Sequence, residues 1–115
     1  ETLIGEFVAG LPAADADRVV IATKAGQTRF SDPVDFAPAA IRASVEGSLR
    51  RLRRPAIDLL QLHNPTPDLL AARPEILACL ADLRREGAIR ASIPPGEGEA
   101  ACANSPPRSC RRTTI

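Results

Sequence analysis

Apolar residues along the first 91 positions of the chain recur with two alternating spacings. One is the three-to-four-residue spacing of an amphipathic helix, and the other is the short apolar run of a buried strand. Helices are predicted on this basis at 2–9, 38–52 and 74–86, and strands at 18–23, 57–62 and 88–91. The alternation predicts an α/β fold in which three parallel strands form one sheet, with the last two helices on one side of it.

The stretch 56–65, AIDLLQLHNP, is the centre of this pattern and ends in His63, the only histidine of the chain. Both faces of its strand are largely apolar, which is typical of a parallel sheet covered by helices. By the two-residue period, Gln61 and His63 share a face. Chemistry in such sheets sits at the carboxyl ends of strands, where His63 lies. A structural, hydrogen-bonded histidine is the competing interpretation.

Lys24 follows the 18–23 strand and shares a face with Val20 and Ala22. The segment 26–37 contains Gly, Asp, Ser and Pro without a period, which predicts a loop at the same end of the sheet as Lys24. Loops at this end often carry functional residues. An ordinary cation at a strand end is the alternative for Lys24.

Composition narrows the classes of function. With 44% apolar residues, 25% charged residues and a net charge of +1, the chain resembles an ordinary soluble domain. A charge this small gives no reason to expect nucleic acid or an anionic membrane as a partner. No apolar run approaches the roughly 20 residues that span a bilayer, and the first residues lack a signal peptide's pattern. We therefore expect a cytoplasmic protein.

Two groups of side chains have plain interpretations. The three cysteines, Cys79, Cys102 and Cys110, lack the close spacing of a zinc or redox motif, so we expect no metal site and reduced thiols. Four arginines, at 50, 51, 53 and 54, fall at the end of the 38–52 helix. Cations at that end complement the helix dipole, and we favour this solvated-end interpretation over a phosphate or nucleic-acid site.

The residues that are absent, and the last segment, suggest a fragment. The sequence contains no Met and no Tyr, so no phenol is available as a proton donor. From Ser92 onward the composition is rich in Pro, Gly and Arg and poor in large apolar residues. We expect a domain fragment over 1–91 and, over 92–115, a tail that is disordered or read out of frame. A functional Pro-rich or Cys-bearing tail is the alternative.

Three stretches carry a family resemblance: VVIATKAG, IRASVEGSLRRLRRPAIDLLQLHNP and LADLRREGAIRA. Together they resemble the central part of the aldo-keto reductase family, NADP-dependent oxidoreductases built on a (β/α)8 TIM-type barrel. The resemblance implies that Lys24 and His63 are catalytic, and that the Asp and Tyr completing the tetrad lie upstream. Asp58 matches a position of the family's pattern, without a catalytic role.

The resemblance also implies the chemistry. In the family a hydride passes from the nicotinamide to a carbonyl carbon while the tyrosine protonates the oxygen. The lysine lowers the pKa of the tyrosine and the histidine orients the carbonyl. On adjacent strands, Lys24 and His63 would lie about 4.8 Å apart and both point inward. The family continues after GAIRA to a Gly-Val-Ser-Asn strand end that holds the nicotinamide, whereas this chain reads Ser92-Ile-Pro-Pro, so no cofactor-binding residue is assigned.

The resulting hypothesis is a truncated aldo-keto reductase, about three βα units of a barrel, that is inactive as it stands. The intact parent would use NADP(H) to reduce a small carbonyl substrate. The alternative is a non-catalytic binding or regulatory module on the same framework. A tyrosine upstream, with an aspartate shortly before it, would favour the enzyme.

Overall fold

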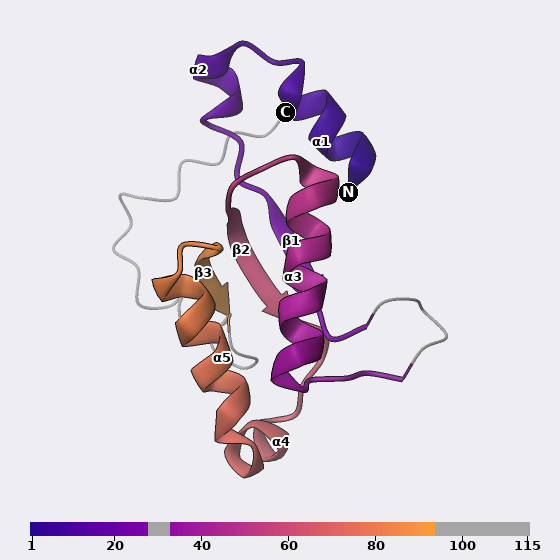
Figure 1. Cartoon of the computed structure of the whole chain (residues 1–115), viewed down its shortest axis with the longest axis vertical. Coiled ribbons are helices and arrows are strands. Elements are labelled where there is room, and N and C mark those ends of the chain that lie inside the picture. Colours follow the sequence, from indigo (N-terminus) through magenta and orange to yellow (C-terminus); the bar gives the residue numbers. More distant parts are fainter. Residues whose placement is uncertain (28–32, 94–115) are drawn as a thin grey trace, which may run out of the picture.

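The structure is a computed structural model, and it describes residues 1–27 and 33–93. One or two helices precede each strand along these ranges (Figure 1). In chain order they are α1 Thr2–Ala9, α2 Ala13–Ala16, β1 Ala22–Ala25, α3 Pro38–Leu52, β2 Ile57–Leu62, α4 Pro67–Ala72, α5 Pro74–Arg85 and β3 Ile89–Ile93. The long helices α3 and α5 pack on one side of the sheet, as predicted.

The strands form one parallel sheet in the order β1-β2-β3. Ala22 of β1 is the register partner of Leu59, and Ile57 of β2 is the partner of Ile89. This confirms the predicted α/β class and the parallel topology; an antiparallel first pair would have refuted both. Strand β2 alone, among the described strands, has a neighbour on each side.

The bounds predicted for β1 are wrong. The strand runs from Ala22 to Ala25 instead of 18–23, and Val20 is 75% exposed rather than buried. The backbone N–H of Ile21 donates to the Asp58 carboxylate at 2.9 Å instead of to a strand carbonyl. At the other end, the Ala25 carbonyl accepts the N–H of His63 at 2.9 Å, which extends the pairing beyond the apolar run.

Strand β3 continues past the predicted limit of 91. Ser92 and Ile93 pair with Leu60 and Gln61, so the tail predicted from 92 begins at least two residues too early. The backbone groups of β2 offer partners irrespective of the change in composition. Residues 94–115, including Cys102 and Cys110, lie outside the described residues.

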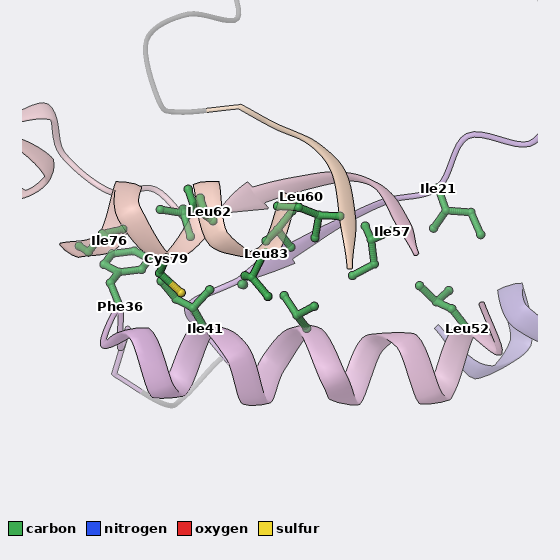
Figure 2. Close-up of a cluster of buried hydrophobic side chains, with 14 of the residues drawn as sticks. Ile21, Phe36, Ile41, Leu52, Ile57, Leu60, Leu62, Ile76, Cys79 and Leu83 are labelled. Atoms are coloured by element: carbon green, nitrogen blue, oxygen red, sulfur yellow. The ribbon is translucent and has the colours of Figure 1, made fainter. Parts of the chain in front are cut away.

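The hydrophobic core lies between the sheet and the two long helices (Figure 2). Helix α3 contributes Ile41, Val45 and Leu52 to this core, and its Leu49 is partly buried. Helix α5 contributes Ile76, Cys79, Leu80 and Leu83, whereas its Leu77 is 43% exposed. Phe36, from the loop before α3, also packs into this core. The most deeply buried large side chains are Ile41, Val45, Leu52, Ile57, Leu60, Ile76 and Ile89. No helix in the described ranges is long and apolar enough to cross a membrane.

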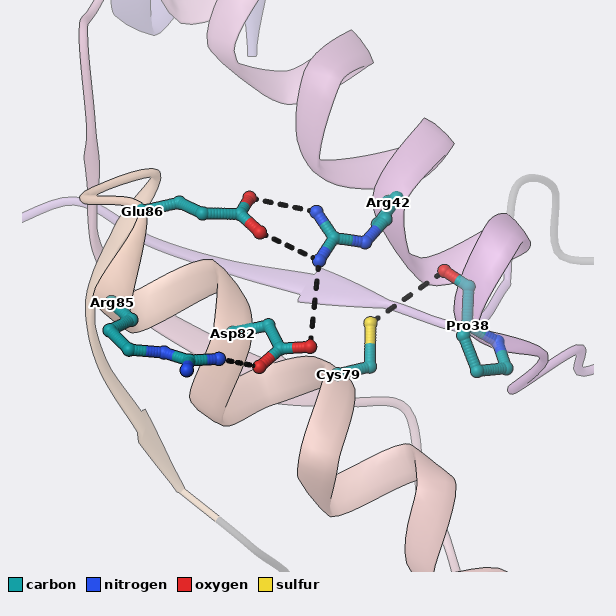
Figure 3. Close-up of polar contacts among 6 residues, drawn as sticks. All are labelled: Pro38, Arg42, Cys79, Asp82, Arg85 and Glu86. Carbon is teal, nitrogen blue, oxygen red and sulfur yellow. Dashed lines mark hydrogen bonds and ion pairs between the residues drawn. The ribbon is translucent and has the colours of Figure 1, made fainter.

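Charged residues join α3 to α5 at the surface of this core (Figure 3). Both terminal nitrogens of Arg42 donate hydrogen bonds to the Glu86 carboxylate, at 2.8 and 2.9 Å. Arg42 also lies 3.9 Å from the carboxylate of Asp82, which forms a further ion pair with Arg85. Close by, the thiol of Cys79 is buried and lies 3.7 Å from the Pro38 carbonyl. Burial raises the pKa of the Cys79 thiol, so this cysteine stays protonated at neutral pH.

Helix α1 is held against α3 through Gly5. A Cβ atom at Gly5 would lie 2.6 Å from the Arg51 carbonyl oxygen and 2.7 Å from that of Leu52. Both are backbone atoms, which cannot rotate away. The close approach of the two helices therefore requires glycine at this position.

Prediction for Gly5. Gly5→Ala should destabilise the chain by about 1–3 kcal/mol, because the added methyl group forces the two helices apart. Gly47→Ala is the matched control: its Cβ would meet only the end of the Arg51 side chain, at 2.9 Å, and a half-exposed side chain can shift where backbone cannot. Helix propensity there favours alanine by about 1 kcal/mol. Urea unfolding followed by circular dichroism measures both, and equal destabilisation by the two variants would contradict this packing.

Prediction for Glu86. The hydrogen bonds from Arg42 lower the pKa of Glu86, so the folded state binds its proton less readily than the unfolded state does. The contribution of this pair is therefore present above the unfolded pKa and is lost as the pH falls through the folded value. Glu86→Gln should reduce stability at pH 7 and leave it nearly unchanged at pH 3. Glu46→Gln, on the exposed side of α3, is the control and should have no effect at either pH; urea midpoints provide the measurement.

Candidate active site

The two candidate catalytic residues lie on one face of the sheet, at the carboxyl ends of adjacent strands. Lys24 is the third residue of β1, and its register partner in β2 is Gln61. His63 comes two residues after Gln61 and therefore shares its face. This offset corrects the expected separation: one strand spacing and two residues of rise place the Cα atoms of Lys24 and His63 about 8 Å apart, not 4.8 Å.

The turn that carries His63 is held by its backbone. The N–H of His63 donates to Ala25, and the N–H of Asn64 donates to the Leu62 carbonyl at 3.1 Å. Asn64 adopts a left-handed conformation, with φ of 51°, which asparagine tolerates better than most residues. Thr66 then caps α4 by accepting the N–H of Leu69 at 3.2 Å. The half-buried His63 thus occupies a defined strand end rather than a loose loop.

The loop after Lys24 is closed at its base. The N–H of Asp35 donates to the Gly26 carbonyl at 2.7 Å, and the Asp35 carboxylate accepts the N–H of Ala37 at 2.8 Å. Gly26 has φ of 106°, and a Cβ there would lie 2.3 Å from the Phe36 ring. Sequence reasoning assigned no role to Asp35 or Phe36. A local sequence pattern could have identified them: an aspartate two residues before a helix N-cap, followed by an aromatic residue.

Lys24, on the outer strand β1, is one of the residues that line a pocket of about 690 Å³ along α3. Small residues of the helix, among them Ala40, Ala43 and Ser44, form its wall. No ion pair joins Lys24 to a carboxylate in the part of the chain that the structure describes. The lysine charge is therefore free to act on a group brought beside it.

The carboxylate of Glu1, also in the wall of this pocket, is already engaged. It accepts hydrogen bonds from Thr23 at 2.5 Å, Ser48 at 2.9 Å and Arg51 at 2.6 Å. Partial burial raises the pKa of Glu1, but these three donors outweigh it and bring the value below normal. Glu1 therefore stays ionised and committed to its donors at neutral pH.

Asp58, at the opposite end of β2, has a structural role. Its side chain is 9% exposed, and besides the N–H of Ile21 it pairs with Arg54 at 3.7 Å and Arg90 at 3.3 Å. It thus connects β1, β2 and β3 near their beginnings. Arg54 is only 17% exposed, so the solvated-end interpretation is wrong for this arginine, because it turns inward to Asp58.

On the face that carries the candidate residues, the described part of β3 has no polar side chain for a nicotinamide carboxamide. On the face that carries Lys24 and His63, β3 presents Ala91 and Ile93, whose side chains cannot hydrogen-bond a carboxamide. Ser92 points to the other face, where it lines a pocket with Leu77 and Leu80 of α5.

No group of His, Cys, Asp and Glu suited to a metal ion occurs in the described ranges. The site consists of a cation and an imidazole, which can stabilise developing negative charge and donate a hydrogen bond to it.

A parallel sheet with helices on one side, and with its polar candidates at the strand ends, is the arrangement of a βα-barrel segment. The sequence model of the aldo/keto reductase family matches residues 1–92. The chain belongs to this family. This confirms the resemblance and the segment of TIM-type barrel that it implied.

Related proteins cover the same segment. A 6-dehydroglucose reductase from Novosphingobium aromaticivorans is 37% identical over 93 residues, which make up 79% of this chain and 29% of that protein. The human aflatoxin B1 aldehyde reductase member 2 is 42% identical over 65 residues, 56% of this chain and 17% of that protein.

Solved structures agree. An aldo-keto reductase from Bacillus halodurans, in its holo form, is similar with a TM-score of 0.65 and 30% identity, over 80% of this chain and 30% of that one. A glycerol dehydrogenase from Gluconobacter oxydans gives a TM-score of 0.66 at 30% identity, over 91% of this chain and 34% of that one. The chain spans about a third or less of the length of these four relatives.

Prediction for Asp58. Asp58→Asn should destabilise the chain by about 1–3 kcal/mol, because Arg54 and Arg90 lose their shared carboxylate while the N–H of Ile21 keeps an acceptor. Asp68→Asn, on the exposed first turn of α4, should cost no more than about 0.5 kcal/mol. Thermal unfolding of the two variants and the parent chain measures the difference. A small loss at Asp58 would mean that the three strands do not depend on this carboxylate.

Proposed function

We propose that the chain derives from an NADP-dependent oxidoreductase that reduces the carbonyl group of a small molecule. The single observation that carries this proposal is the placement of Lys24 and His63 on one face, at the ends of adjacent parallel strands, in a member of the aldo/keto reductase family. Strand ends of this kind carry the catalytic groups in barrel enzymes. Both residues are thereby candidates for the catalytic set.

Each residue has a role that suits its chemistry. The positive charge of Lys24 would favour the ionised form of a neighbouring phenol, which makes that phenol a better proton donor. His63 would donate a hydrogen bond to the carbonyl oxygen and so polarise it. Gln61, the register partner of Lys24, is placed to contact either side chain.

The names of the relatives support the substrate class. Two are named as reductases, one of 6-dehydroglucose and one of aflatoxin B1 aldehyde, and a third is named as a glycerol dehydrogenase. All three names describe exchange between a carbonyl group and an alcohol. We therefore assign small carbonyl compounds to the intact parent, with NADP(H) as its cofactor and the cytoplasm as its compartment.

A second candidate function uses the same framework: a non-catalytic binding or regulatory module. The observation that favours it is the face of β3, where the described residues Ala91 and Ile93 offer no side chain that could hydrogen-bond a cofactor. The two proposals differ in what precedes this segment. The enzyme requires an upstream tyrosine with an aspartate before it, and the module does not.

Prediction for activity. The 115-residue chain should neither bind NADPH tightly nor reduce a carbonyl compound, since it contains no tyrosine and lacks the Gly-Val-Ser-Asn strand end that holds the nicotinamide in the family. Loss of a general acid alone commonly costs about 10²- to 10⁴-fold in rate. NADPH fluorescence and its absorbance decay with a panel of aldehydes measure the two properties. Saturable turnover that Lys24→Ala abolishes, and that Ser92→Ala leaves intact, would overturn the proposal of inactivity.

Prediction for the reading frame. The family match ends at residue 92, where the composition also changes. We propose that the residues after this point come from a shifted frame. Translation of the source DNA in all three frames should reveal, opened near the codon for Ala91, a strand that ends in Gly-Val-Ser-like residues. If every frame lacks such a continuation, the tail is genuine and the frameshift proposal is wrong.

A further inference from the structure

A pocket of about 280 Å³ lies at the beginnings of the strands, the end of the sheet opposite Lys24 and His63. Small residues of the first two helices, Gly5, Ala9 and Ala16, form one wall. The turn between α3 and β2 supplies Arg53 and Arg54. The remaining charges in the wall are Arg90 of β3 and Asp17. Three arginines from two separate segments thus converge on one space.

The partners of two of these arginines lie beside the pocket. Arg53 pairs with Glu6 at 3.3 Å, and both side chains are at least half exposed. Arg90 lies 3.3 Å from the Asp58 carboxylate and is 65% exposed. The exposed Arg53–Glu6 pair contributes little and is readily exchanged for another anion. The Asp58 carboxylate beside Arg90 is only 9% exposed, so Arg90 would keep this partner and bind an anion with the N–H groups that Asp58 does not use.

Arg54 differs because its hydrogen-bonding capacity is not used. Its terminal nitrogen is 3.7 Å from Asp58, beyond hydrogen-bond length, and that carboxylate oxygen already accepts the N–H of Ile21. Its Nε is the one buried side-chain nitrogen or oxygen without a hydrogen-bond partner among the described residues. A buried N–H that lacks a partner carries a free-energy cost, which a bound acceptor would relieve.

We propose that this pocket binds a compact oxyanion, of which a phosphate group is the best match. An arginine presents Nε–H and one terminal N–H as a parallel pair that fits two oxygens of a phosphate. Rotation of the Arg54 guanidinium away from Asp58 turns this pair toward the pocket, and Arg90 contacts a third oxygen. Asp17 opposes binding and so limits its strength.

The dipole interpretation of the arginine group does not account for this arrangement. Cations at the end of α3 complement its dipole, and that suffices for Arg50 and Arg51. Asp58 explains why Arg54 and Arg90 turn toward the same region, but neither Asp58 nor the dipole provides an acceptor for the buried Arg54 Nε. The oxyanion site provides that acceptor. It is independent of any oxidoreductase activity.

The test is a titration of the whole chain with inorganic phosphate, followed by the ¹⁵N–¹H signals of the arginine Nε groups and compared with sodium chloride at equal ionic strength. The Arg54 signal, assigned by its loss in Arg54→Lys, should shift saturably with phosphate and not with chloride. The Arg50 signal should not saturate. Absence of a saturable shift at Arg54, or equal responses at Arg50 and Arg54, would overturn the site.

Variants sharpen the result without removing the buried arginine. Asp17→Asn removes the opposing charge and should tighten phosphate binding by roughly fivefold, and Arg90→Gln should weaken it by a similar factor. Arg50→Gln, a matched loss of one positive charge outside this pocket, should leave the affinity unchanged. If Arg50→Gln and Arg90→Gln weaken binding equally, the phosphate responds to net charge alone and the proposal is wrong.

Discussion

The parallel pairing of β2 with both neighbours is the constraint on which the rest of the structure depends. Each outer strand has its described hydrogen-bonding neighbour only in β2, so the register of β2 sets the position of every residue on β1 and β3. A shift of one residue would exchange the two faces of a strand, moving Lys24 into the helix-covered core and Ala25 out of it. The apolar side of β2, with Leu60 and Leu62 buried under α3 and α5, opposes such a shift.

The two ends of the sheet have different roles: one carries paired charges that stabilise the fold, and the other carries the candidate catalytic residues. At the beginnings, Asp58 collects the N–H of Ile21 and the charges of Arg54 and Arg90, which ties all three strands to one carboxylate. At the carboxyl ends, the polar groups of Lys24 and His63 are not paired with each other or with a described carboxylate. Barrel folds divide stability and chemistry between their two ends in this way. The unpaired groups are therefore more informative about function than the paired ones.

Much of this arrangement could be predicted from the sequence because it depends on local spacing. The helix 38–52 and the strand 57–62 coincide with α3 and β2, where a complete apolar period is flanked by proline. The shared face of Gln61 and His63 follows from alternation alone. The ends of β1 and β3 could not be predicted, since they depend on partners elsewhere in the chain: Asp58 takes the N–H of Ile21, and β2 offers pairing to Ser92 and Ile93. The predicted distance between Lys24 and His63 was wrong for the same reason, because the register between two strands depends on tertiary structure.

The arginines at 50, 51, 53 and 54 show that a local sequence pattern does not determine the role of each side chain. Four neighbouring arginines satisfy one electrostatic rule as a set, yet their contacts separate them: Arg51 binds Glu1, Arg53 binds Glu6, and Arg54 turns toward Asp58. Arg53 also ends α3 in a left-handed conformation, with φ of 54°, which directs the following residue inward. The backbone at a single cap therefore decides which guanidinium is solvated and which is buried. A chain with glycine at position 53 would adopt this conformation with less strain, but it would lose the pair with Glu6 and one of the three cations around the pocket. The strained residue is best explained by the positive charge that it places there.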